Sequence, residues 1–210
     1  MHVIAIVNLK GGSGKTTVAT HLAARFARLG HRPLLVDLDR QKSSADWVER
    51  RQEGLPRIDS IVLDTDDLEL PRSHPFVIID VPAGMKKRAL ETVVLAADAI
   101  LVPVLPGVFD EAASARFLAA VEEFKGVRKG RRPVAVVGNR VKRGTAAERR
   151  LDTFLDGVRF PAVAKLSDSQ FYLSAAEQGV TVFDLPVGRV RKALEEWKPL
   201  LSWIDEGVGG

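Results

Sequence analysis

The chain has 210 residues and a formal net charge of +4. Hydrophobic residues make up 46% and charged residues 28%, so the chain can fold one domain with its own core and is not intrinsically disordered. The absence of cysteine excludes disulfides, thiolate metal sites and cysteine nucleophiles. No apolar run reaches the roughly 20 residues of a membrane span, and the N-terminus lacks a signal-peptide pattern. We therefore expect a cytoplasmic protein.

Short apolar runs alternate with segments of helical periodicity along the whole chain. Such alternation is typical of parallel strands joined by right-handed helical crossovers. The sequence therefore predicts the α/β class: a single-domain, three-layer α/β/α fold with a mostly parallel sheet over residues 1–205, and a flexible tail over 206–210. In chain order, the predicted strands are Val3–Val7, Pro33–Val36, Ile58–Leu63, Phe76–Asp80, Ala99–Val104, Pro133–Val137 and Ala162–Lys165. The predicted helices are Thr16–Leu29, Ser43–Arg51, Lys86–Ala97, Asp110–Lys125, Thr145–Leu155, Asp168–Gln178 and Gly188–Trp203.

A glycine-rich segment joins the first predicted strand to the first predicted helix. It reads KGGSGKTT over residues 10–17, and strand, loop and helix together are the context of a phosphate-binding loop. Glycines let backbone N–H groups turn inward as an anion nest, and the helix presents its positive end to the same phosphates. We expect Lys15 to reach the β- and γ-phosphates and Thr16 to bind Mg²⁺. The alternative is a glycine-rich turn with a surface lysine. The further nucleotide contacts are expected from Gly11, Gly12, Ser13, Gly14 and Thr17.

The loop departs from the general pattern G-x-x-x-x-G-K-[ST], because Leu9 stands at the first glycine position and Lys10 follows it. In this respect it resembles the "deviant" Walker A motif of the ParA/MinD class of P-loop ATPases. The resemblance covers nearly the whole chain and is closest to small ParA-type proteins without a helix-turn-helix. It implies ATP and Mg²⁺ as cofactors and a homodimer that forms on ATP binding, in which Lys10 reaches the partner's phosphates. The alternative for Lys10 is a solvated lysine beside the loop.

Two carboxylates follow the second predicted strand. Asp37 and Asp39 are two residues apart, and residues two apart on a strand face the same side, so both can address a metal and an attacking water. The resemblance assigns Asp37 to a metal-bound water and Asp39 to the hydrolytic water. The family usually reads Asp-Pro-Gln here, whereas this chain has Arg40 in place of proline. The alternative for Asp39 is a capping role at the helix that begins at Ser43.

A third carboxylate and an amide stand at two further strand ends. Asp80 follows the apolar run Phe76–Ile79 in the Walker B pattern and is predicted to hold Mg²⁺ directly or through water, with a strand-end turn as the alternative. The stretch Val81–Gly84 after it is a candidate switch that senses the γ-phosphate. Asn139 follows the strand Pro133–Val137, and the resemblance assigns it a contact with adenine.

Basic residues are concentrated in one tract. Between Phe124 and Gly144 there are eight basic residues and no acid, so the rest of the chain carries +4 − 8 = −4. This asymmetry suggests a polyanionic partner, and a solvated face is the alternative. The resemblance implies DNA binding without sequence preference, since no room precedes the first strand for a helix-turn-helix. The candidate DNA contacts are Lys142, Arg143, Arg149, Arg150, Arg189, Arg191 and Lys192.

Together with these residues, the resemblance implies a ParA-type ATPase that dimerises on ATP, binds DNA non-specifically and positions a cargo. It further implies that the cargo is a plasmid, a chromosome region or a protein assembly, and that a ParB-like or other adaptor protein stimulates hydrolysis at the nucleoid. One alternative is a MinD-like ATPase that cycles on membranes, which acidic residues in the last predicted helix oppose. A second alternative is a metabolic P-loop enzyme of the dethiobiotin-synthetase kind.

Overall fold

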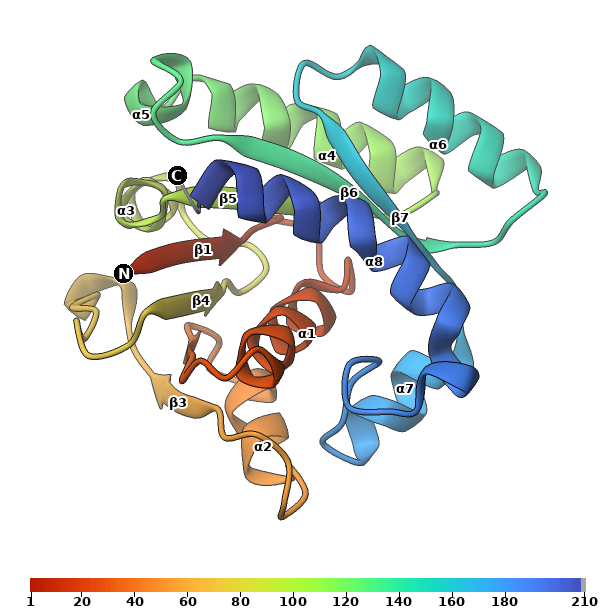
Figure 1. Ribbon diagram of the computed structural model, residues 1–210. Helices are drawn as coiled ribbons and strands as arrows, with labels where there is room; N and C mark the ends of the chain where they lie inside the picture. The colour runs from red at the N-terminus through yellow and green to blue at the C-terminus, as the bar shows by residue number, and fades with distance from the viewer. Residues whose placement is uncertain (209–210) are drawn as a thin grey trace.

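The fold is built on one seven-stranded sheet in which all strands are parallel (Figure 1). The computed structural model describes residues 1–208, and the strand order is β3-β2-β4-β1-β5-β6-β7. The central strands are buried on both faces, which explains why they read as continuous apolar runs. The strands are β1 (His2–Ile6), β2 (Leu34–Asp37), β3 (Asp59–Val62), β4 (Phe76–Asp80), β5 (Ala99–Val104), β6 (Val134–Val141) and β7 (Ala162–Ser167).

Helices cover both faces of this sheet, so the predicted three-layer α/β/α fold is confirmed. One face packs against α3 (Lys87–Ala96), α4 (Val108–Glu122), α5 (Lys125–Arg128) and α6 (Ala146–Gly157). The other face packs against α1 (Lys15–Arg28), α2 (Ser43–Glu49), α7 (Gln170–Glu177) and α8 (Val187–Val208). A short 3-10 helix, η1 (Thr65–Asp67), follows β3. No helix within residues 1–208 is both long enough and apolar enough to cross a bilayer.

The carboxyl ends of the central strands lie in register. Asp80 at the end of β4 pairs with Ile6 of β1 on one side and with Asp37 of β2 on the other. The polar residues that follow these strands are therefore delivered to the same edge of the sheet, as expected for an open parallel sheet.

Most elements begin and end within two residues of the sequence-based prediction, and three differences are larger. Strand β6 continues to Val141 through a register irregularity at Arg140, whose φ of 53° is left-handed, so Asn139 lies inside the strand rather than after it. The predicted helix Asp110–Lys125 is two helices, α4 and α5. The predicted boundary between domain and tail at residue 206 falls inside α8, and residues 209–210 lie outside the described chain.

Candidate functional site

The glycine-rich loop between β1 and α1 takes a shape that only glycine allows at its last turn. Gly14 has a φ of +92°, and a Cβ placed there would lie 1.9 Å from Nδ2 of Asn139. That Nδ2 donates a hydrogen bond to the carbonyl of Ser13 at 2.8 Å, and the amide is buried. Asn139, to which the resemblance assigns an adenine contact, thus holds the loop through its amide nitrogen.

The start of the loop is anchored by Asn8, a residue that the sequence analysis missed. Its Nδ2 donates to the carbonyl of Pro103 at 2.8 Å and to Oγ of Ser114 at 3.2 Å, while its Oδ1 accepts from the N–H of Lys10 at 3.0 Å. Asn8 therefore ties the loop to the end of β5 and to α4. The sequence did contain a signal for Asn8, since it is a polar residue between an apolar strand and a glycine-rich segment.

A buried ammonium lies at the centre of the loop. Nζ of Lys15 donates to the carbonyl of Lys10 at 3.2 Å, and burial lowers the pKa of Lys15, while the charges of Asp80 and Asp39 oppose that shift. Oγ of Ser13 is also buried and has no hydrogen-bond partner within residues 1–208. A buried cation and an unsatisfied hydroxyl inside a glycine cradle fit a bound polyphosphate.

Thr16 and Asp80 form the other half of this site. Oγ1 of Thr16 donates to Oδ2 of Asp80 at 2.7 Å. Burial raises the pKa of Asp80 to about 7, and the nearby Asp37 adds to this, while the Thr16 hydroxyl and the Lys15 ammonium oppose it. Hydroxyl and carboxylate oxygens are the ligands that Mg²⁺ prefers, with water and phosphate oxygens completing its shell. The pair therefore fits Mg²⁺ bound together with a nucleotide. Within residues 1–208, no group of three or more His, Asp or Glu could hold a metal by itself.

The strand geometry that led us to expect Asp37 and Asp39 on one face applies only up to Asp37. Strand β2 ends at Asp37, so Asp39 lies beyond it in the loop to α2. The fully buried Asp37 accepts backbone N–H groups on both carboxylate oxygens, from Ser44 at 2.9 Å, Ala45 at 3.0 Å and Asp39 at 2.8 Å. The capping role that was considered for Asp39 thus belongs to Asp37. The proposed role of Asp37 toward a metal-bound water stays a prediction.

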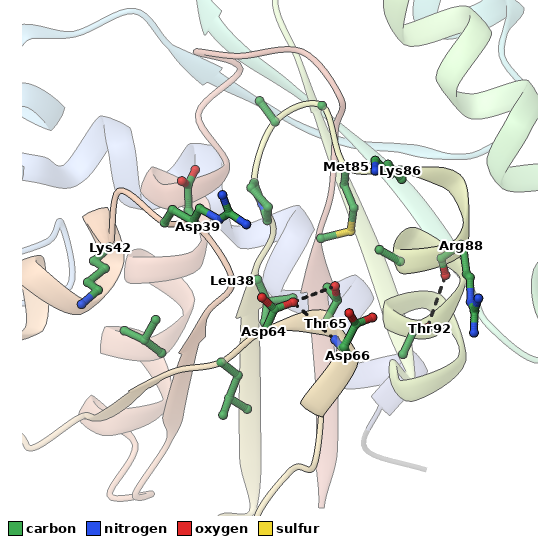
Figure 2. Close-up of a pocket in the computed structure, with 17 residues that line it drawn as sticks. Leu38, Asp39, Lys42, Asp64, Thr65, Asp66, Met85, Lys86, Arg88 and Thr92 are labelled. Atoms are coloured by element: carbon green, nitrogen blue, oxygen red, sulfur yellow. Dashed lines mark hydrogen bonds between the residues drawn. The ribbon is translucent and has the colours of Figure 1, made fainter.

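Asp39 faces an open groove of about 1030 Å³, shown in Figure 2. The groove runs between the β2–α2 loop and the segment from Pro82 to Thr92, and η1 forms its far wall. Oδ1 of Asp39 accepts a hydrogen bond from the N–H of Gln41 at 2.9 Å, and the Asp39 side chain is only partly buried. The N–H of Gly84 donates to the carbonyl of Leu9 at 3.1 Å, which connects the candidate switch after β4 to the phosphate loop.

Comparisons with known proteins agree with this geometry. The sequence pattern described as "CobQ/CobB/MinD/ParA nucleotide binding domain" matches residues 4–182. The chain belongs to this family. It is 30% identical to the "Maintenance of carboxysome distribution protein A" of Halothiobacillus neapolitanus over 208 residues, which cover 96% of this chain and 95% of that one.

Solved structures of other proteins share the fold of this ParA/MinD-type domain. A putative plasmid partition protein from Borrelia burgdorferi bound to AMPPNP superposes with a TM-score of 0.73 at 17% identity, covering 96% of this chain and 98% of that one. Apo McdA from Cyanothece superposes with a TM-score of 0.75 at 18% identity, and the superposition covers 96% of this chain and 99% of that one. At these identities the likeness shows the fold alone.

Lys10, which the resemblance assigns to the partner's phosphates, is paired within its own chain. Nζ of Lys10 lies 3.4 Å from Oδ1 of Asp110 in the first turn of α4, and both side chains are partly exposed. Gly107 permits this arrangement, since a Cβ there would lie 2.3 Å from Oδ2 of Asp110. Asp110 is a second residue that the sequence analysis missed, because 100 positions separate it from Lys10.

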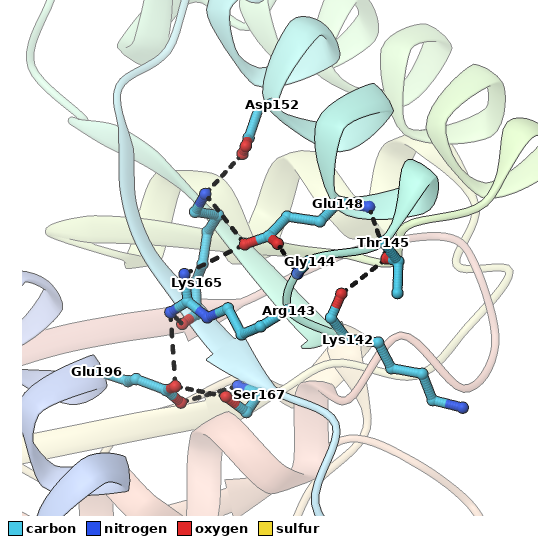
Figure 3. Close-up of polar contacts among 9 residues, drawn as sticks. All are labelled: Lys142, Arg143, Gly144, Thr145, Glu148, Asp152, Lys165, Ser167 and Glu196. Atoms are coloured by element: carbon cyan, nitrogen blue, oxygen red, sulfur yellow. Dashed lines mark hydrogen bonds and ion pairs between the residues drawn. The ribbon is translucent and has the colours of Figure 1, made fainter.

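The predicted DNA contacts do not form one group. Arg150 of α6 points to α4, where its guanidinium pairs with the buried Glu111 at 3.1 Å. Arg143 lies above the edge strand β7 and pairs with Glu148 of α6 at 3.3 Å and with Glu196 of α8 at 3.5 Å (Figure 3). The charges of Arg150 and Arg143 are therefore largely balanced. Lys142 is exposed and lies 3.7 Å from the partly exposed carboxylate of Asp168. The other candidates are also exposed: Arg149, Arg189, Arg191 and Lys192.

Proposed function

We propose that this protein is a ParA-type ATPase that binds ATP with Mg²⁺, dimerises on it, binds DNA without sequence preference and positions a cargo. The observation that supports this most directly is the phosphate cradle, in which the buried Lys15 lies beside the pair formed by Thr16 and Asp80. A buried ammonium without a carboxylate in hydrogen-bond contact is costly in the free protein, and phosphate oxygens compensate it on binding.

Each residue of the cradle has a defined task in this proposal. The N–H groups from Gly11 to Thr17 bind phosphate oxygens, and Lys15 neutralises charge on the β- and γ-phosphates. Thr16 and Asp80 hold Mg²⁺, which, when bound, draws negative charge from the phosphates. Asp39 faces the open groove and orients the attacking water. The amide nitrogen of Asn139 is already bonded to Ser13, so we assign the adenine contact to its Oδ1, which can accept from the adenine amino group.

Dimerisation explains the ion pair of Lys10. In the single chain Asp110 holds the Lys10 ammonium, and a partly exposed pair of this kind is weak, at about 0–1 kcal/mol. A phosphate of a second chain offers Lys10 a stronger, charge-assisted contact. We therefore propose that Lys10 leaves Asp110 when two chains enclose the nucleotide. Hydrolysis then removes the γ-phosphate contacts and separates the chains.

DNA binding and cargo follow from the charged surface and from the relatives. The exposed cations Lys142, Arg189, Arg191 and Lys192 neutralise backbone phosphates in this proposal, and a dimer doubles their number. The relatives are named for carboxysome distribution and for plasmid partition. We accordingly propose a plasmid, a chromosome region or a protein assembly as cargo. A ParB-like or other adaptor stimulates hydrolysis, and the protein resides on the nucleoid in the cytoplasm.

Mass measurement in solution tests the proposal. With a non-hydrolysable ATP analogue and Mg²⁺, light scattering coupled to gel filtration is expected to show twice the 22.9 kDa chain mass, and gel shift to show tighter DNA binding. Lys15→Ala is expected to abolish both responses. Arg28→Ala is the matched control, because it removes an equal charge from the exposed end of α1, where no DNA contact is proposed. An unchanged mass with bound analogue refutes the dimer, and nucleotide-dependent binding to anionic vesicles without DNA binding favours the membrane-cycling alternative.

A further inference from the structure

The basic tract found in the sequence is divided into two groups by the sheet. Strand β6 separates five cations between Lys125 and Arg132 from three cations between Arg140 and Arg143. Eight strand residues at about 3.3 Å each span about 26 Å, so the two groups lie at opposite ends of the sheet. Of the second group, Lys142 is one of the proposed DNA contacts at the carboxyl end. The first group lies at the end of the sheet at which β1 begins, which is the end away from the phosphate loop (Figure 1).

The first group is displayed by a fixed turn. Phe124 and Val127 are buried in the core that α4 and α6 share, and they hold α5 against the sheet. Backbone hydrogen bonds close the turn, from the N–H of Gly130 to the carbonyl of Val127 at 2.9 Å and from the N–H of Arg131 to the carbonyl of Gly126 at 3.0 Å. The apolar side chains face inward and the charged ones face solvent. We name four exposed cations the α5 basic turn: Lys125, Arg128, Lys129 and Arg131.

Neighbouring acids do not neutralise these cations. Asp98 lies 3.9 Å from Arg132, and Glu122 is paired with Arg159. Within residues 1–208, no member of the α5 basic turn forms an ion pair. Glu123 is an exposed acid that precedes the turn, so the local charge is 4 − 1 = +3. A rigid, uncompensated cluster of this kind attracts a polyanion.

We propose that the α5 basic turn is a second contact for the phosphate backbone of double-stranded DNA, and that it acts without nucleotide. The choice of DNA as the polyanion rests on the proposed function. DNA is favoured over a membrane because the apolar residues of the turn are buried in the core and leave nothing to insert into lipid. Arginine and lysine neutralise phosphates without reading bases. The contact is independent of nucleotide because no residue of the turn touches the phosphate loop.

This contact gives the free protein a basal affinity for DNA. The ATP-bound dimer then adds the cations at the carboxyl end to those already engaged at α5. Because the two groups are far more than 10 Å apart, their contributions to the binding free energy are expected to add.

Fluorescence anisotropy with a short labelled duplex tests the inference on the full chain, with and without a non-hydrolysable ATP analogue. The variant Arg128→Gln with Lys129→Gln removes two cations of the turn. The control Arg28→Gln with Arg72→Gln removes two exposed cations elsewhere and gives the same net charge. Without nucleotide, the affinity of the α5 variant is expected to fall about tenfold at ~100 mM salt, and its log–log salt slope to shrink by about 1.8. The control is expected to match wild type within about twofold.

Three results overturn the inference. The first is a wild-type protein that does not bind DNA without nucleotide, and the second is equal loss in the α5 variant and the control. The third is an α5 variant that keeps its DNA affinity but loses binding to anionic vesicles. Equal melting temperatures of the variants show that folding is intact. A different result refutes the proposed function, namely that the nucleotide analogue changes neither the solution mass nor the DNA affinity of the wild-type protein.

Discussion

His21 lies in the second turn of α1, fully enclosed by aromatic rings. Its ring stacks on Trp197 with centroids 5.1 Å apart and planes within 6°, and Tyr172 and Phe183 complete the enclosure. Nδ1 lies 2.8 Å from the carbonyl of Thr17, while Nε2 accepts the N–H of Val182 at 3.4 Å. These partners assign the proton to Nδ1 of a neutral ring. A second proton on Nε2 would face the N–H of Val182, so the fold disfavours the charged form.

Burial accordingly lowers the pKa of His21 from 6.5 to about 4, with the Thr17 carbonyl and the charge of Asp184 opposing the shift. The unfolded chain takes up a proton near pH 6.5, whereas the native chain does so near pH 4. The stability due to the neutral ring is therefore fully present above pH 6.5 and is lost as the pH falls from 6.5 to 4. At about 1.4 kcal/mol per pH unit, the loss in unfolding free energy is about 3 kcal/mol.

Urea unfolding at pH 7 and at pH 4.5 of the wild type and of His21→Phe isolates this loss, because the variant keeps the aromatic stack but has no titrating ring. Asp80, whose pKa is raised to about 7, gains stability over the same range in both chains. The unfolding free energy of His21→Phe is therefore expected to rise by about 2 kcal/mol relative to the wild type between pH 7 and pH 4.5. His31→Gln, at an exposed histidine, is the control and is expected to follow the wild type. Asp59, whose pKa is lowered to about 2 by its partners His74, Arg32 and Arg57, affects stability only below about pH 4. If the unfolding free energies of His21→Phe and of the wild type change by the same amount over this range, the assignment is wrong.

Two substitutions in the nucleotide site give further predictions. Gly14→Ala is expected to abolish binding of a fluorescent ATP analogue and to cost more than about 1 kcal/mol in urea unfolding, because its Cβ would collide with Asn139 at a positive φ; normal analogue binding contradicts this. Asp110→Ala frees Lys10 from its pairing in the single chain and is expected to raise the ATP-dependent dimer population severalfold in light scattering, and an unchanged population shows that the pair does not oppose dimerisation.

The sequence predicted the sheet well because its central strands are buried on both faces and read as uninterrupted apolar runs. It also placed the phosphate loop, since strand, glycines and helix are contiguous. The end of β6 was missed because Arg140 takes a left-handed conformation that its residue type does not signal. The bulge continues the strand past Asn139, whose amide reaches the phosphate loop.

The remaining errors concern side chains whose partners are distant in sequence. Which carboxylate caps α2 depends on where β2 ends, and the spacing of Asp37 and Asp39 does not show this. The pairing of Lys10 with Asp110 and that of Arg150 with Glu111 join segments that only the folded sheet brings together. Likewise, the basic tract is continuous in sequence, but an eight-residue strand divides it in space.

The buried carboxylate of Asp37 fixes both ends of the segment that carries Asp39. It accepts the N–H of Asp39 at one end and N–H groups of the first turn of α2 at the other. Between them, the N–H of Gln41 donates to Oδ1 of Asp39 and the N–H of Lys42 donates to the carbonyl of Asp39, at 2.9 Å each, so the whole segment is tied to Asp39. A displacement of Asp39 is therefore expected to move α2. Trp47 is buried in that helix, so the fluorescence of a variant that keeps only this one of the three tryptophans is expected to report such a movement.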